Sequence, residues 1–344
     1  TVGYSHVYSS GFIGASINAY NSLYGVPGEG GVDDEPGVDI DLSQMQLTLR
    51  GEHRSKTSYY NAIRYHLSYG DYQHQELEGS EVATEFASQG IDSRIEVSHS
   101  GSKSHRGTFG LHINSSDVQV QGEEAFIPSS QTVSPAIFTI EEYSLSEDLK
   151  LQAGGRLQYS SIDALESKDY LSKNISVGAI RNITGNLKAS STLSFSERAP
   201  TATELFADGF HVARQIFEKG NDRLKTEKSL GMDFSLENSG KFVSPKITFF
   251  AQNYSNYIDL ASFNSDSQFT YFDSKARIFG VEGSATSSLY SKENTKVELI
   301  TSASIMRGKN TTTDRHLGRM PTAKAAVSLK AKVKAFSFIL VPSQ

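Results

Sequence analysis

Long stretches in which apolar and polar residues alternate run through most of this chain of 344 residues. In the clearest stretch, Leu149, Leu151 and Leu157 alternate with Lys150 and Arg156. A period of two predicts β-strands that have one apolar and one polar face. We count about sixteen such stretches, many of roughly ten residues or more, whereas strands in soluble sheets are mostly five or six residues long. The chain is therefore predicted to be all-β.

Tight turns and long polar loops are expected to alternate strictly between these strands. Short connections are expected at 9–11 and at 101–104. Long connections are expected at 25–41, 73–85 and 122–134. Outer-membrane barrels show this asymmetry, with short turns on one side of the membrane and longer loops on the other. A soluble β-sandwich gives no reason for it, and a soluble repeat protein would need a fixed sequence period. We therefore predict a transmembrane antiparallel β-barrel.

Composition agrees with this class but does not select it. The mean hydropathy of −0.38 is compatible with a soluble protein and equally with a membrane barrel, because the strands of such a barrel alternate lipid-facing and lumen-facing residues. The chain has no cysteine, which excludes disulfides and cysteine metal sites, and its net charge of −6 argues against nucleic acid as a partner. No G-x-S-x-G elbow, phosphate-binding glycine loop or compact acid–base cluster indicates an enzyme.

The longest interval without strand alternation lies between Phe195 and Ser229. Such a segment is usually a functional loop. Thr201 and Glu204 have the spacing of a capping box, which predicts a short helix that Gly209 would end in a left-handed turn. We expect this loop to bind the ligand.

Two motifs flank this loop, SERAPTATELF and FEKGNDRLKTEKS. The Arg198-Ala199-Pro200 element and the later element with Asn221, Leu224 and Glu227 resemble the paired signature of TonB-dependent outer-membrane receptors. Two further segments, NYSNYIDL and FDSKARIFGVEG, are similar to strand motifs of that family. The resemblance implies a bacterial outer-membrane transport receptor, active as a monomer surrounded by outer-membrane lipid, that imports its cargo with energy from the TonB complex.

Within that family, ELFADGFHVARQIFEKGN is most similar to the zinc-uptake receptors. The resemblance implies that His211 helps to bind a transported zinc ion. The GEEAF segment adds Glu123 or Glu124 as a carboxylate ligand, and Asp208 is a further candidate from the long loop. Imidazole and carboxylate are suitable ligands for Zn²⁺. One departure is the loop at 25–41, which is acidic but lacks the histidines expected in a zinc receptor.

Three other cargoes or functions stay open. In a heme receptor, His211 would be an axial iron ligand, and Phe206, Phe210 and Phe217 would line an apolar pocket, although packing within the loop explains them as well. A siderophore receptor and a passive porin are the remaining alternatives. His66 and His112 are expected on the lumen face, and no pair of histidines shows the helical or hairpin spacing of a ready metal site. No resident cofactor is expected.

The resemblance implies a barrel of 22 strands with an N-terminal plug. We expect this chain to be one incomplete barrel domain over residues 1–344, lacking the plug, the first strand or strands and perhaps four strands at the end, with its ligand loop at about 199–225. The plug would complete the metal site and contact TonB.

Overall fold

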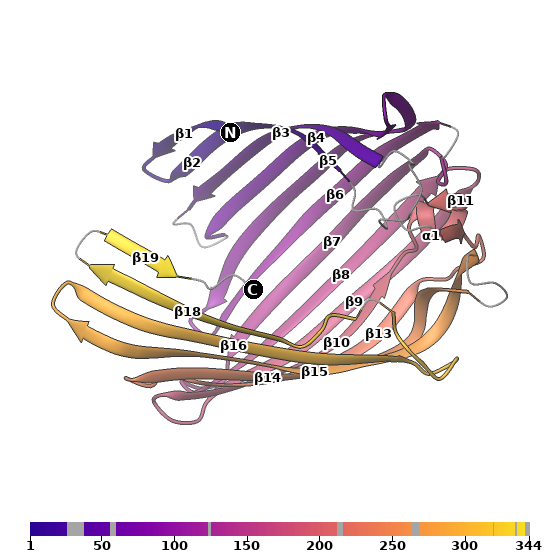
Figure 1. Ribbon diagram of the computed structural model, residues 1–344. Coiled ribbons are helices and arrows are strands. Elements are labelled where there is room, and N and C mark those ends of the chain that lie inside the picture. The colour runs from indigo at the N-terminus through magenta and orange to yellow at the C-terminus, as the bar shows by residue number, and fades with distance from the viewer. Residues whose placement is uncertain are drawn as a thin grey trace.

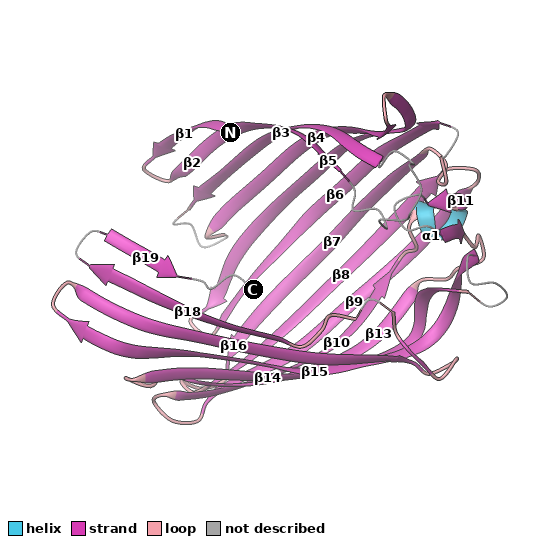
Figure 2. Ribbon diagram, viewed as in Figure 1, coloured by secondary structure: helices cyan, strands magenta, loops and turns pink. Residues whose placement is uncertain are grey.

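A computed structural model shows a single large antiparallel sheet that curves round into a barrel-like wall (Figure 1). The structure describes residues 1–25, 38–55, 60–122, 125–211, 216–262, 268–318, 320–333 and 336–340. Strands make up nearly all of it, as Figure 2 shows. The one helix in these ranges, α1 (Ala202–Phe206), has five residues, and no helix there is long and apolar enough to cross a membrane. The all-β prediction is confirmed.

Within the described ranges the sheet contains nineteen strands, of which three are short. These three lie in the connections: β11 (Asp208–His211), β12 (Ile216–Lys219) and β17 (Arg315–His316). The other sixteen form the wall, which agrees with the predicted number. They are β1 (Val2–Tyr8), β2 (Gly11–Gly25), β3 (Val38–Arg54), β4 (Ala62–Glu78), β5 (Glu81–Ser102), β6 (His105–Gly122), β7 (Ser130–Ser144), β8 (Leu149–Asp163), β9 (Ser167–Asn182), β10 (Leu187–Arg198), β13 (Glu227–Asn238), β14 (Val243–Ala261), β15 (Gln268–Lys292), β16 (Thr295–Asn310), β18 (Lys324–Val333) and β19 (Phe336–Leu340).

Neighbouring wall strands pair antiparallel in sequence order, from β1 through β10 and then from β13 through β19. Two pairings skip short strands: β10 pairs with β13, and β16 pairs with β18. In the described ranges, β1 and β19 are the two edges of the sheet, and no register joins them. The long loops therefore bridge strands that are neighbours in the wall.

The two faces of the wall differ in polarity. Ile95, Leu111, Ile137 and Leu157 stand opposite one another on four adjacent strands, and each is between 40% and 56% exposed. Alternate residues point to the other face, which carries hydrogen-bonded polar side chains such as His112. An apolar band outside and a polar interior are the pattern of a membrane barrel.

The connections at one end of the wall are all short, but those at the other end are not all long. A two-residue turn joins β4 to β5, with Gly79 at a φ of 63°, and three residues join β8 to β9. The predicted long loop at 73–85 is therefore wrong, and so is the strict alternation. The segment is polar because both strands extend past the apolar band, where Gln73 still donates to Glu85 at 2.6 Å.

The acidic segment predicted as a loop at 25–41 lies partly outside the described residues and partly in strands. Residues 26–37, which include Asp33, Asp34 and Glu35, lie outside the described ranges. Asp39 and Asp41 belong to β3, where they pair with β2 and β4. The predicted loop therefore ends earlier than expected, since β3 already begins at Val38.

Candidate functional site

The connection between β10 and β13, residues 199–226, is the most elaborate one of the chain and is called the long loop here. It contains α1 and the hairpin of β11 and β12, which lie together at the loop-bearing end of the wall, at the right in Figure 1. β12 also pairs in parallel with the first residues of β15. This pairing attaches the tip of the loop to the wall two strands away.

A small hydrophobic core holds the long loop. Helix α1 begins with the predicted capping box, since the Glu204 amide donates to the Thr201 hydroxyl at 3.2 Å and the Thr201 amide donates to the Glu204 carboxylate at 2.8 Å. The helix buries Leu205 and Phe206 against Leu224 of the same loop and against two wall residues, Ile162 and Ile258. The loop is therefore a folded unit with its own core.

An arginine connects the two sequence motifs that flank the loop. Arg198, the last residue of β10, contacts Glu204 in a bidentate pair at 2.8 and 3.0 Å. Its second guanidinium nitrogen lies 3.3 Å from Glu227, which stands directly opposite in the register of β10 and β13. Asn221 of the second motif donates its backbone amide to the carbonyl of Glu204 at 3.0 Å. The two motifs thus form one structural module at the base of the loop.

Gly209 has a different role from the one predicted. Helix α1 ends at Phe206 and is capped by Ala207, and Gly209 lies within β11, where its φ is not positive. A Cβ at Gly209 would lie 2.9 Å from the Cα of Phe126, which belongs to the β6–β7 connection. Asp208 donates its amide to the carbonyl of Phe126 at 2.8 Å. The glycine is needed because a neighbouring loop packs directly on this hairpin.

His211 lies at the end of β11 between an aromatic ring and a buried carboxylate. Its ring stacks on Phe126 with centroids 4.2 Å apart and an angle of 18° between the planes. Its Nδ1 lies 2.9 Å from Oε1 of Glu218, which is 0% exposed. The other oxygen of Glu218 accepts from the hydroxyl of Tyr271 at 2.9 Å. The long loop, the β6–β7 connection and strand β15 therefore all contribute to the surroundings of one imidazole.

The contact with Glu218 bears on the tautomer of His211. When Nδ1 donates to an ionised Glu218, the neutral ring has its lone pair on Nε2. Within the described part of the chain, Nε2 has no hydrogen-bond partner, and the side chain is 21% exposed. A histidine that donates its second N–H to a carboxylate is the usual arrangement of a metal ligand. The geometry presents Nε2 as a donor atom for a metal ion.

The other predicted ligands are placed differently. Glu123 and Glu124 lie outside the described residues, although Phe126 of the same segment contacts His211. Asp208 is exposed, and it is three residues from His211 in a strand, so the two side chains point to opposite faces. The structure therefore separates Asp208 from the imidazole. No group of three histidine and acidic side chains forms around His211 in the described ranges.

The three phenylalanines have separate environments. Phe206 belongs to the loop core, whereas Phe210 is 43% exposed and Phe217 is half-buried. The packing role expected for Phe206 is therefore confirmed. Phe210 directly precedes His211 in β11, so its exposed ring lies on the opposite face of the strand from the imidazole.

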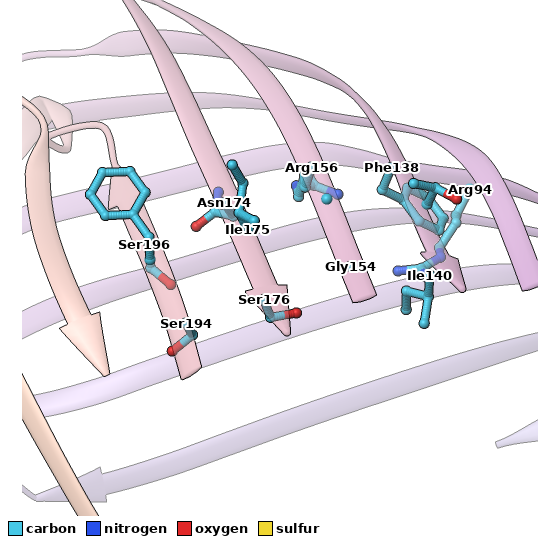
Figure 3. Close-up of a pocket in the computed structure, with 13 residues that line it drawn as sticks. Arg94, Phe138, Ile140, Gly154, Arg156, Asn174, Ile175, Ser176, Ser194 and Ser196 are labelled. Atoms are coloured by element: carbon cyan, nitrogen blue, oxygen red, sulfur yellow. The ribbon is translucent and has the colours of Figure 1, made fainter. Parts of the chain in front are cut away.

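The inner wall carries a separate hollow of about 310 Å³. Figure 3 shows Arg94 beside the ring of Phe138, and Arg156 and Asn174 on neighbouring strands along the same surface. The guanidinium carbon of Arg94 lies 4.3 Å from the centroid of Phe138. The hollow lies on the wall and not beside His211, and it adds cationic groups to the lumen.

Most of these lumen charges have partners. Arg156 contacts Nδ1 of His112 at 3.0 Å, and Nε2 of His112 lies 2.7 Å from Asp92. Arg94 lies 2.6 Å from Glu96. The predicted lumen position of His112 is confirmed, and its contacts show a wall residue in a hydrogen-bond network.

Comparison with known proteins was made on the sequence and on the fold. Residues 1–334 match the family model described as "TonB dependent receptor-like, beta-barrel". The fold is similar to the copper transporter OprC, with a TM-score of 0.76 and 15% identity over 94% of this chain and 54% of that one. The fold is also similar to the FrpB iron transporter from Neisseria meningitidis. The TM-score is 0.72, with 11% identity over 95% of this chain and 56% of that one.

A third similar structure is the hemophore receptor HasR of Serratia marcescens, solved with its hemophore HasA and heme. Its TM-score is 0.72, with 14% identity over 99% of this chain and 63% of that one. The chain thus spans a little over half the length of each of these structures. At these identities the likeness shows the fold alone.

Proposed function

This chain belongs to the TonB-dependent receptor-like β-barrel family, whose members are outer-membrane proteins of Gram-negative bacteria, and we propose that it captures zinc ions for import. The family consists of receptors and transporters and not of enzymes. In the proposed function the ion is cargo, and no bond of a substrate is made or broken. The observation that carries the proposal is the orientation of His211 by Glu218 and Phe126.

Zinc is favoured by the donor atom and by its surroundings. A neutral imidazole with its second nitrogen bonded to a carboxylate is a common zinc ligand. The Glu218 carboxylate is fully buried behind the ring, and a carboxylate bonded to Nδ1 raises the basicity of Nε2 toward a cation. The partly exposed imidazole lets an ion reach Nε2 from the loop-bearing end of the wall.

A transport site has to release its ion, which suits a small number of protein ligands. We propose that Glu123 or Glu124 supplies a carboxylate next to His211, because their segment continues into Phe126, which stacks on the imidazole. Water or groups from other parts of the receptor would complete the four positions that Zn²⁺ prefers. Energy coupling through TonB and passage past a plug are part of the same proposal.

Heme is the second candidate, and a specific observation favours it. Phe126 stacks on His211 with ring centroids 4.2 Å apart, so aromatic surface lies directly against the imidazole. A histidine whose Nδ1 donates to a carboxylate can also serve as an axial ligand of heme iron. HasR, one of the similar structures, was solved with heme.

The test is to titrate the whole receptor, purified in detergent, with Zn²⁺ and separately with heme. Wild type is compared with His211→Ala. We expect the substitution to remove one saturable Zn²⁺ site per chain, and we expect no His211-dependent change with heme. A heme absorbance change that depends on His211 would assign the site to heme. Binding of neither would contradict metal capture at His211 and favour a siderophore receptor or a passive porin.

A further inference from the structure

A second group of metal-binding side chains lies at the opposite end of the wall from the long loop. His99 of β5, His105 of β6 and Glu141 of β7 place one ligand atom each within 4.8 Å of one another. All three residues are next to the short turns, since β5 ends at Ser102 and β7 ends at Ser144. The group is independent of His211 and of the function proposed for it.

This group shows that the prediction of no histidine pair with hairpin spacing was wrong. His99 stands opposite Gly107 in the same register that joins most of β5 and β6. His105 lies two residues before Gly107 on β6, so the two histidines are diagonal neighbours. The pair follows from this register and not from a recognised spacing in the sequence.

The distances within the group suit a metal ion. His99 Nε2 lies 3.3 Å from Oε1 of Glu141, and His105 Nε2 lies 2.8 Å from Oε2. Ligand atoms about 2.0–2.2 Å from a tetrahedral Zn²⁺ are separated from one another by roughly 3.3 Å. Small rotations of the side chains would therefore bring two imidazole nitrogens and one carboxylate oxygen onto a common ion.

Three neighbouring residues hold these ligands in place. The hydroxyl of Thr139 donates to Oε1 of Glu141 at 2.8 Å. Tyr143 stacks on the ring of His105, with centroids 4.2 Å apart and 5° between the planes. Gly107 faces Glu141 across β6 and β7, and a Cβ there would overlap the carboxylate. Outer contacts of this kind orient ligands before a metal binds.

The group lies on the outward face of the wall, at the edge of the apolar band. His99 follows Val97 on the same face of β5, and its ring lies 6.2 Å from that of Phe109, which is 51% exposed. All three side chains are between 22% and 25% exposed. An ion can therefore reach them from the water beside the short turns, whereas the apolar band faces lipid.

We propose that His99, His105 and Glu141 form a Zn²⁺ site that ties three adjacent strands together at the end of the barrel with the short turns. Two imidazoles and one carboxylate are a common ligand set for Zn²⁺, and water would take the fourth position. The ion would replace the hydrogen bonds that now join each imidazole to Glu141. Its role would be structural, because the ion would link β5, β6 and β7 near their ends.

The test uses the whole protein in detergent with the His211→Ala substitution, so that the loop site cannot contribute. After removal of metal with a chelator, Zn²⁺ affinity is measured by competition with a chromogenic chelator. We expect one ion per chain, and weakening by about 100-fold or more when His99→Gln and His105→Gln are added. The matched control is His6→Gln with His53→Gln, because these two histidines also lie near the short turns and stack on Tyr8. This control should leave the affinity unchanged.

A second variant tests the site in case the double variant misfolds. Gly107→Ala keeps all three ligands but displaces the Glu141 carboxylate, so we expect weaker Zn²⁺ binding with an unchanged far-UV circular dichroism spectrum. Co²⁺ in place of Zn²⁺ should give the visible bands of a four-coordinate ion. No saturable binding in the His211→Ala protein, or equal affinity in the cluster and control variants, would overturn the proposal. Either result would leave the assignment of His211 unaffected.

Discussion

Replacing Glu218 with glutamine changes a buried carboxyl group that contacts His211. The carboxylate accepts from Nδ1 of His211 and from the hydroxyl of Tyr271, each at 2.9 Å. Glutamine has only one accepting atom, and its NH₂ group cannot accept from the second donor. If that NH₂ faces His211, the ring must accept at Nδ1 and carry its proton on Nε2, which removes the lone pair needed for Zn²⁺.

The size of the effect follows from these contacts. A hydrogen bond to a charged group contributes about 1.5–3 kcal/mol, which corresponds to roughly 10- to 150-fold in affinity. Loss of a carboxylate partner of a metal-bound histidine typically costs about 10–100-fold in metal affinity. We therefore expect Glu218→Gln to weaken Zn²⁺ binding at His211 by about 10–100-fold.

The assay is Zn²⁺ competition with a chromogenic chelator on the whole receptor in detergent, with the cluster at His99 and His105 removed by glutamine substitutions. The matched control is Glu166→Gln at the same end of the wall, because this glutamate is 62% exposed and only pairs with Lys168. Such exposed pairs contribute little, so its affinity should not change. Wild-type affinity in Glu218→Gln, combined with loss of binding in His211→Ala, would refute the orienting role of Glu218.

Three further substitutions test the long loop. Leu205→Ala leaves a cavity in the loop core and should cost about 2–5 kcal/mol locally; hydrogen exchange should accelerate in the loop but not in the wall. Arg198→Gln removes the cation between two carboxylates, but the side chain is 43% exposed, so a loss of about 1 kcal/mol is expected, seen as faster proteolysis of the loop. Gly209→Ala forces Phe126 away from His211 and should weaken Zn²⁺ binding; unchanged affinity would show that the stacking is dispensable.

The wall could be predicted from the sequence because lipid outside and polar groups inside impose one residue period on every strand. This period is lost where the apolar band ends. β4 and β5 continue as paired strands with polar residues on both faces, and this part of a strand has the composition of a loop. The turn at Gly79 was missed for this reason.

The candidate sites were harder to predict from the sequence, because they depend on pairing between strands. Glu218 was not identified as a partner of His211, since the contact follows from the register of β11 and β12 and from the absence of a side chain at Gly209. The capping box of α1 was predictable because it is local in sequence. The pair of His99 and His105 likewise depends on the register of β5 and β6, which places His99 opposite Gly107.

The core beneath the long loop has a kinetic consequence for the receptor. Ordering a chain costs about 1–2 kcal/mol per residue in backbone entropy alone. The loop core packs against the wall through Leu205, Phe206 and Leu224. The entropy of the described part of the loop is therefore lost when the protein folds and not when cargo binds. In the proposed function, an arriving ion would therefore meet a loop core that is already folded. Its association rate would then be set by diffusion and by the field at the mouth of the barrel, and the lifetime of the bound ion would determine affinity.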